Sequence, residues 1–224
     1  MTWQDVIDEA KPKYLNGIKA KITALRKQGT MIIPEDRYLF EPFKLTPYNK
    51  VKVVILGKEP NHIKNMSHGL AYSSFSNQRT QTLELIFNEI KRDYLPEFAQ
   101  SKYNCFQHGN LEQWAKQGVL LLNETFTVEM NNPQSHQEIG WKFFVIDIIK
   151  ALNKKEKPIV FMFWGNDNYV QYISSKHLIL KSEYPTSSSD FNGCNHFTKA
   201  NTFLQKHYEK GLNWSVLSNY NEMV

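Results

Sequence analysis

A cluster of polar residues directly follows the apolar run Val51–Leu56 and Gly57. The cluster contains a cation, a carboxylate, a proline, an amide and an imidazole, namely Lys58, Glu59, Pro60, Asn61 and His62. Carboxylate and imidazole groups can move protons at neutral pH. In open parallel sheets, ligand-binding and catalytic groups collect beyond the carboxyl ends of the strands, where exposed loops are held by rigid elements. The cluster therefore predicts a site of chemistry at the end of a buried strand.

Three further apolar runs also end in polar groups. Asn123 and Thr125 follow the second run, Gly165 and Asn166 follow the third, and Tyr184 follows the fourth. One such junction alone is explained equally well by a helix cap or a turn. In a parallel sheet, however, all four junctions lie at one edge, and their coincidence favours a common pocket.

The elements that must position these groups alternate along the chain. Short, continuous apolar runs at 51–56, 118–123, 158–164 and 177–182 are typical of strands covered on both faces. Helical patterns fall at 3–28, 80–94, 111–117, 139–152, 166–174 and 198–208, with Pro12 expected to divide the first, and 32–48 is expected to be an extended connector. We therefore predict an α/β fold, a three-layer α/β/α sandwich around a central four-stranded, mostly parallel sheet, formed by a single domain over 1–224.

Several kinds of site lack their sequence patterns. The stretch after Gly57 has neither the later glycines of a dinucleotide loop nor the ending of a P-loop, and no G-x-S-x-G elbow of a serine esterase is present. The histidines at 62, 68, 136 and 196 lack the spacing of common zinc motifs, and Cys105 and Cys194 form no C-x-x-C pair. We expect no metal, no nucleotide cofactor, and two reduced structural thiols.

The charge of the chain favours an acidic partner. Its 27 Lys and Arg outnumber its 22 Asp and Glu, which gives a formal charge of +5. Excess positive charge promotes binding to polyanions, although many basic proteins bind none. The beginning of the chain carries acids where a signal peptide carries bases, and no apolar run approaches the roughly 20 residues that cross a bilayer. We therefore expect a cytoplasmic protein that does not enter a membrane.

The motifs as a whole resemble those of the family 1 uracil-DNA glycosylases. The similar stretches occur in the same order from about residue 45 to 214: VKVVILGKEPNH, SHGLAYSS, GVLLLNETFTV, SHQEIGW, FMFWGN, and HLILKSEYPTSSS followed by GCNHFTKAN. The resemblance implies hydrolysis of the N-glycosidic bond of a uracil that is flipped out of DNA, without metal or cofactor. It implies DNA as the partner.

The resemblance also implies roles for individual residues. Tyr72 matches the aromatic ring that stacks on the flipped base, and Asn123 matches the asparagine that recognises the uracil edge. Glu59 stands in place of the aspartate that positions or activates water. Asn61 replaces a tyrosine whose ring blocks the 5-methyl group of thymine. Tyr184 replaces a histidine that donates a hydrogen bond to uracil O2 as charge builds on the departing base.

The loop after the fourth run departs from the family as well. Ser188 stands where a leucine normally wedges into the duplex, and the loop before GCNHF is shorter. Phe191 could wedge instead, or could anchor the loop by packing. Lys58 and His62 are expected near the base, although Lys58 could instead lie near a phosphate or in solvent. The residues expected to contact DNA are Pro60, His136, Gly165, Asn166, Pro185, Thr186, Ser187 and Ser188. His62 and His136 could equally be structural.

The substitutions leave three hypotheses open. The first is a glycosylase with reduced uracil excision or altered base choice, because Glu59 keeps a carboxylate and a phenol can still donate a hydrogen bond. The second is a catalytically silent paralogue that binds DNA or a protein. The third is a decoy for DNA-mimicking glycosylase inhibitors. Because Ser188 removes the wedge, we expect single-stranded or mismatched DNA to be preferred. We expect a monomer.

Overall fold

A parallel sheet of four short strands lies at the centre of the computed structural model, which describes residues 1–75, 79–94 and 106–216. The strands are β2 (Val53–Gly57), β3 (Val119–Asn123), β5 (Val160–Trp164) and β6 (Leu178–Ser182). Their order is β3-β2-β5-β6, and each neighbouring pair is parallel. This confirms the predicted sheet. Cys105 lies outside the described residues.

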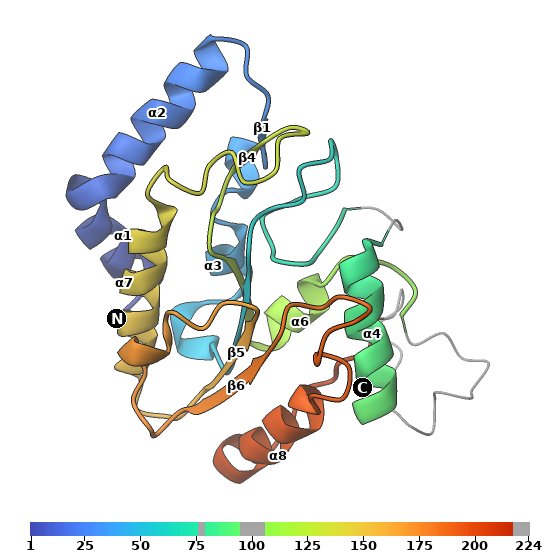
Figure 1. The fold of residues 1–224 in the computed structure, drawn as a ribbon. Coiled ribbons are helices and arrows are strands. Elements are labelled where there is room, and N and C mark those ends of the chain that lie inside the picture. Colours follow the sequence, from blue (N-terminus) through green and yellow to red (C-terminus); the bar gives the residue numbers. More distant parts are fainter. Residues whose placement is uncertain (76–78, 95–105, 217–224) are drawn as a thin grey trace.

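Helices cover both faces of this sheet (Figure 1). Along β2, Val54 and Leu56 point into one hydrophobic cluster, whereas Val53 and Ile55 point into the other. The first cluster is completed by α1 (Trp3–Ala10), α2 (Asn16–Lys27), α3 (Glu41–Leu45) and α7 (Trp141–Asn153), and the second by α4 (Gln81–Asp93), α6 (Glu112–Gln117) and α8 (His196–Tyr208). Burial on both faces explains why the strands are continuous apolar runs. The predicted α/β/α layering is confirmed.

The first helical region does not break at Pro12. A π-helical turn, Lys11–Leu15, joins α1 to α2 without an intervening loop. A proline lacks an N–H and crowds the preceding turn of an α-helix, and the wider π turn accommodates it. The residue therefore changes the helix type instead of dividing the helix.

Two other expectations were wrong. The segment 166–174 forms only the 3-10 turn η4 (Val170–Tyr172), because the Asn166 side chain accepts the Asn168 N–H, 3.0 Å away, and diverts the backbone from a helix. The connector 32–48 is not extended throughout. It contains β1 (Ile32–Ile33), which pairs with β4 (Val128–Glu129), the turn η2 (Asp36–Tyr38) and α3, and η3 (Tyr48–Lys50) begins at its end.

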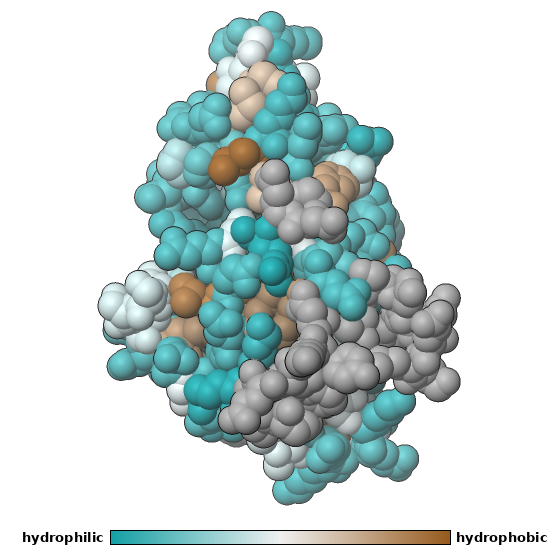
Figure 2. Space-filling view, turned by 90° about the vertical axis from the view of Figure 1, so that its right-hand side faces the viewer, coloured by the Kyte–Doolittle hydropathy of each residue, from teal (hydrophilic) through white to brown (hydrophobic). Residues whose placement is uncertain are grey.

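Where its residues are described, the face of the molecule shown in Figure 2 is mostly hydrophilic. On the face shown in Figure 2, hydrophobic residues form small separate patches. The large exposed apolar side chains come from different segments: Met1, Met31, Ile63, Phe75, Phe143 and Tyr184. Across the described residues, no helix has the length and apolar character needed to cross a membrane.

Candidate base-binding site

The four strand ends meet at one edge of the sheet. Gly57 of β2 is in register with Asn123 of β3, and Trp164 of β5 with Ser182 of β6. Hydrogen bonds continue this alignment past the strands, since the Glu124 N–H donates to the Gly57 carbonyl at 2.8 Å. The predicted convergence of the strand-end groups is therefore present in the fold.

Because Gly57 has no side chain, three other side chains pack closely against it. A Cβ atom at this position would lie 2.7 Å from Asn123 Oδ1, 2.9 Å from Ala71 Cβ and 3.4 Å from Tyr72 Cε2. The Tyr72 ring also lies beside Trp164, with 5.3 Å between ring centroids. We call Gly57, Tyr72, Asn123 and Trp164 the pocket floor. An aromatic face and an amide thus lie side by side over a residue without a side chain.

Asn123 is the most informative residue of the pocket floor. Its side chain is only 3% exposed, yet its Oδ1 atom has no hydrogen-bond partner within the described protein. A buried polar atom left without a partner costs about 1–3 kcal/mol. A ligand that carries a hydrogen-bond donor would satisfy this oxygen.

Buried residues support the pocket floor from behind. The Trp164 indole N–H donates to Nδ1 of His196 at 3.0 Å. Burial lowers the pKa of His196 to about 4, so the imidazole is neutral and can accept this bond at neutral pH. Phe191 packs edge-on against Trp164, with 4.9 Å between centroids, and is 1% exposed. Phe191 is therefore a packing anchor and is not exposed for insertion into DNA.

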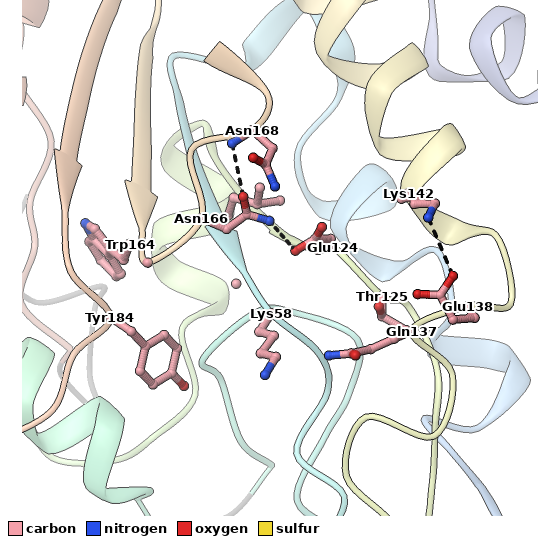
Figure 3. A pocket seen from close by; sticks show the side chains of 13 residues that line it. Lys58, Glu124, Thr125, Gln137, Glu138, Lys142, Trp164, Asn166, Asn168 and Tyr184 are labelled. Atoms are coloured by element: carbon pink, nitrogen blue, oxygen red, sulfur yellow. Dashed lines mark hydrogen bonds and ion pairs between the residues drawn. The ribbon is translucent and has the colours of Figure 1, made fainter. Parts of the chain in front are cut away.

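A cavity of about 680 Å³ opens beside the pocket floor (Figure 3). Three residues at the strand ends line it, namely Leu56, Gly57 and Trp164. Its other lining residues are Lys58, Glu124, Thr125, Gln137, Glu138, Lys142, Gly165, Asn166, Asn168 and Tyr184. Of the predicted site residues, Lys58, Gly165, Asn166 and Tyr184 thus come together here. Glu59, Asn61, His62, Tyr72 and Asn123 are not among the lining residues.

Glu59 and Asn61 are both engaged by neighbouring backbone. The Gln134 N–H donates to both carboxylate oxygens of Glu59, at 3.1 and 2.9 Å. The Ile63 N–H donates to Asn61 Oδ1 at 2.9 Å. The carboxylate and the amide oxygen are therefore held by the loops that surround the pocket. His62, by contrast, has a buried Nδ1 atom without a partner in the described protein.

The loop after β6 is folded tightly on itself. Tyr184 is 37% exposed, Pro185 is buried, and Thr186, Ser187 and Ser188 are exposed. The Thr186 N–H donates to Ser189 Oγ at 3.1 Å, and the Asp190 N–H donates to the Glu183 carboxylate at 3.2 Å. We call the exposed or half-buried group Lys58, Glu59, Asn61, Tyr184 and Ser188 the rim. The three polar residues at the loop tip can contact DNA, but none is an apolar wedge.

A buried carboxylate holds the far end of this loop. Glu89 is 0% exposed and accepts the N–H groups of Gly193 and Asn195, at 2.8 and 3.0 Å. It also accepts hydrogen bonds from Nε and Nη2 of Arg92, both at 2.8 Å. Burial by itself would raise the pKa of Glu89, but these donors together lower it. The carboxylate is thus ionised, and it fixes the chain just before α8.

His136 lies in the interior. It is 2% exposed, its Nδ1 is 2.8 Å from the Thr127 hydroxyl, and burial lowers its pKa. Thr127 also accepts the indole N–H of Trp141 at 2.8 Å. Pro60 is buried as well. His136 Nε2 has no hydrogen-bond partner within the described protein, and contact of the two residues with DNA stays a prediction.

Curated proteins similar to this chain share one name. The uracil-DNA glycosylase of Actinobacillus succinogenes is 38% identical over 223 residues, which cover 96% of this chain and 98% of the relative. That of Coxiella burnetii is 40% identical over 225 residues, with 96% of each chain covered. No family model matches the chain. The chain belongs to the uracil-DNA glycosylase family.

Solved structures of uracil-DNA glycosylases have the same fold. The crystal structure of mimivirus uracil-DNA glycosylase superposes with a TM-score of 0.84 at 22% identity, covering 96% of this chain and 86% of that one. A point variant of mimivirus UNG in complex with UGI gives 0.84 at 24% identity, covering 96% and 88%. The UNG of Nitratifractor salsuginis gives 0.55 at 17% identity, covering 82% and 88%.

Some residues of this glycosylase fold were not singled out from the sequence. Trp164, Gln134 and Glu124 contact predicted site residues, and Glu89 holds the loop that carries others. Only Glu124 has a sequence signal, because it directly follows Asn123. Within the described ranges, no group of three His, Cys, Asp or Glu side chains is placed to hold a metal ion.

Proposed function

We propose that the protein is a DNA glycosylase that hydrolyses the N-glycosidic bond of an extruded pyrimidine nucleotide, with reduced uracil excision or altered base choice. The observation that carries this proposal is the unpartnered Oδ1 of Asn123, buried beside the Tyr72 ring. A pyrimidine stacked on Tyr72 offers a ring N–H to that oxygen. The amide recognises a uracil-type edge in preference to cytosine.

The chemistry needs a carboxylate and a group that stabilises the departing base. The bond between C1′ and the base nitrogen breaks, and its electron pair leaves with the base. The oxygen of water bonds to C1′, and Glu59 takes the water proton. The Tyr184 hydroxyl donates a hydrogen bond to the base as it becomes negative, as a phenol can in an oxyanion hole. The base then takes up a proton from solvent.

The altered base choice follows from Asn61. The amide occupies the place of a blocking ring, and its oxygen is turned toward the Ile63 N–H. A smaller side chain held in this way leaves room for a 5-substituent. We infer that thymine or a 5-modified uracil enters the pocket. Its NH₂ group remains available for a polar substituent.

The DNA partner follows from charge and from the rim. The chain carries a formal charge of +5, and Thr186, Ser187 and Ser188 are exposed beside the pocket. Without an apolar wedge, an extruded base in a duplex is not prevented from returning to its stack. Single-stranded or mismatched DNA is therefore the preferred substrate. The protein acts as a monomer of one domain in the cytoplasm, without metal or cofactor.

The second candidate is a catalytically silent protein that binds DNA or a DNA-mimicking inhibitor. It is favoured by Glu59, whose two oxygens both accept the Gln134 N–H. A carboxylate held in this way is less available to water. The solved complex of mimivirus UNG with UGI supports the inhibitor version by analogy of fold.

Base release from oligonucleotides tests the proposal. The protein is incubated with single strands that contain uracil, thymine or 5-hydroxymethyluracil, and abasic sites are cleaved with alkali. We expect release of at least one base, and Glu59→Ala should abolish it. Retained DNA binding without release of any base would contradict the glycosylase and favour the silent protein.

A restored triple variant locates the defect. Glu59→Asp shortens the side chain and releases the carboxylate from the Gln134 N–H, while Asn61→Tyr and Tyr184→His return the family's residues. The three changes together should increase uracil excision. Failure of this variant would place the defect in the short loop after β6.

A further inference from the structure

A side chain that the proposed mechanism does not use joins two edges of the cavity. Glu124 directly follows Asn123, and its Oε2 accepts the side-chain N–H of Asn166 at 2.8 Å (Figure 3). Its Oε1 accepts the Tyr169 hydroxyl, also at 2.8 Å. Tyr169 is 3% exposed, and burial raises its pKa, so the phenol stays protonated and donates. We call these two hydrogen bonds the Glu124 clamp.

Both ends of the Asn166 amide make a hydrogen bond within the protein. The amide nitrogen donates one N–H to Glu124, and the amide oxygen accepts the Asn168 N–H at 3.0 Å. These two bonds fix the orientation of the side chain. What the turn Gly165–Asn166 presents outward is its backbone, because Gly165 is exposed and has no side chain.

The same turn is held from the opposite side by β6 and Tyr184. The Gly165 N–H donates to the Ser182 carbonyl at 2.9 Å. Gly165 has a φ of +92°, and a Cβ atom there would lie 3.0 Å from Tyr184 Cβ. The turn is thus fixed between Tyr184 and Glu124, and loss of the clamp would free one of its two sides.

We propose that Glu124 is a positioning residue, which holds the Gly165–Asn166 turn in the shape that meets the DNA backbone beside the extruded base. This inference rests on the proposed function of the site. A clamp of this kind acts on DNA binding and leaves the bond-breaking step unchanged. The competing role is a general base, since Glu124 is a carboxylate that lines the cavity. Both of its oxygens already accept a protein hydrogen bond, which favours positioning.

Two substitutions of Glu124 separate these roles. Glu124→Ala removes both acceptors. Glu124→Gln removes the charge but keeps the contacts, because the amide oxygen can accept from Asn166 and the amide NH₂ can donate to the Tyr169 hydroxyl, which accepts as well as donates. Glu9→Ala is the matched control, because Glu9 lies on α1, does not line this cavity, and forms an exposed ion pair with Lys13 at 2.8 Å.

The readouts are binding of a single-stranded uracil oligonucleotide, its KM and kcat, inhibition by free uracil, and the melting temperature. We expect Glu124→Ala to raise Kd and KM for DNA about tenfold, below the roughly hundredfold loss that an ångström of misplacement can cause. The kcat and the inhibition by free uracil should stay close to those of the parent. The melting temperature should fall by about 2–4 °C, because the buried Tyr169 hydroxyl loses its acceptor. Glu124→Gln and Glu9→Ala should behave like the parent.

Three results would overturn the proposal. An equal loss of kcat in Glu124→Gln and Glu124→Ala would make Glu124 a general base. Loss of free-uracil inhibition together with DNA binding would make its role merely structural. Unchanged DNA binding in Glu124→Ala would leave the clamp without a role. If the parent releases no base, the proposed function fails. Comparing the DNA binding of Glu124→Ala with that of the parent then still tests whether the Glu124 clamp positions the turn.

Two further variants test the Glu124 clamp if Glu124→Ala does not fold. Asn166→Asp keeps the acceptor for the Asn168 N–H but places a second carboxylate against Glu124. In the double variant Glu124→Gln, Asn166→Asp, the amide NH₂ at position 124 can donate to the carboxylate at position 166. This variant has the net charge of the parent. We expect weaker DNA binding in the single variant and recovery in the double. An absence of recovery contradicts the clamp.

Discussion

The pocket floor and the rim both lie at the carboxyl ends of the strands but are built in different ways. The pocket floor is packed between buried residues: Gly57 has no space for a side chain, and Trp164 is held by His196 and Phe191. The rim residues lie in loops, and Glu59 and Asn61 are held by single backbone N–H groups. Residues of the pocket floor serve the fold and the site at once. Those of the rim lie outside the strands, and the departures from the family that the sequence predicts fall there.

The largest effect is expected from breaking the pocket floor at Gly57. Gly57→Val places a side chain against Asn123 and Ala71, so we expect base release to fall at least about a hundredfold and unfolding to become easier by about 1–3 kcal/mol. The assay and chemical denaturation measure both. The control is Gly17→Ala in α2, where nothing lies within 4 Å. An active Gly57→Val would show that the pocket floor does not hold the base.

Acid should weaken the pocket floor through His196. Its pKa is about 4 in the folded protein, below the ordinary 6.5, so the unfolded chain takes up the proton first. Stability is complete above about pH 6.5 and falls as the pH drops toward 4, by about 2–3 kcal/mol from this group. Denaturation at several pH values measures the loss. His196→Gln keeps an acceptor for Trp164 and should flatten the dependence, and an unchanged slope would contradict this assignment.

At the rim, Tyr184→Phe tests the hydrogen-bond donor. We expect kcat to fall about tenfold, which is less than the 10²–10³ lost with a donor in a dry site, because Tyr184 is partly exposed. Stability should not change. Tyr172→Phe, on the turn η4, is the matched control. Equal activity of Tyr184→Phe and the parent would remove Tyr184 from the mechanism.

The smallest effect is expected from Ser188→Leu. A leucine at this exposed position can fill the gap left by an extruded base, so we expect release from duplex DNA to rise about threefold. Release from single strands should stay the same. A rise that is equal on both substrates would show that the new side chain acts by affinity instead of by wedging.

The sequence predicted the part of the molecule that packing determines. The strands were recognisable because burial on both faces makes them continuous apolar runs. Tyr72 and Asn123, which the motifs singled out, both lie against Gly57 at the strand ends. The contact between Glu59 and Gln134 joins residues that are far apart in the chain, so no local pattern reveals it. The helix expected at 166–174 failed because the amphipathic pattern was outweighed by the Asn166 side chain, which turns the backbone.

The buried Glu89 has a consequence for engineering the chain. It fastens Gly193 and Asn195, while β6 fastens the other end of the loop at Ser182. Phe191 must remain to fill the interior. The stretch 186–190 is thus held at both ends, so a loop of another length can be grafted there without disturbing the sheet.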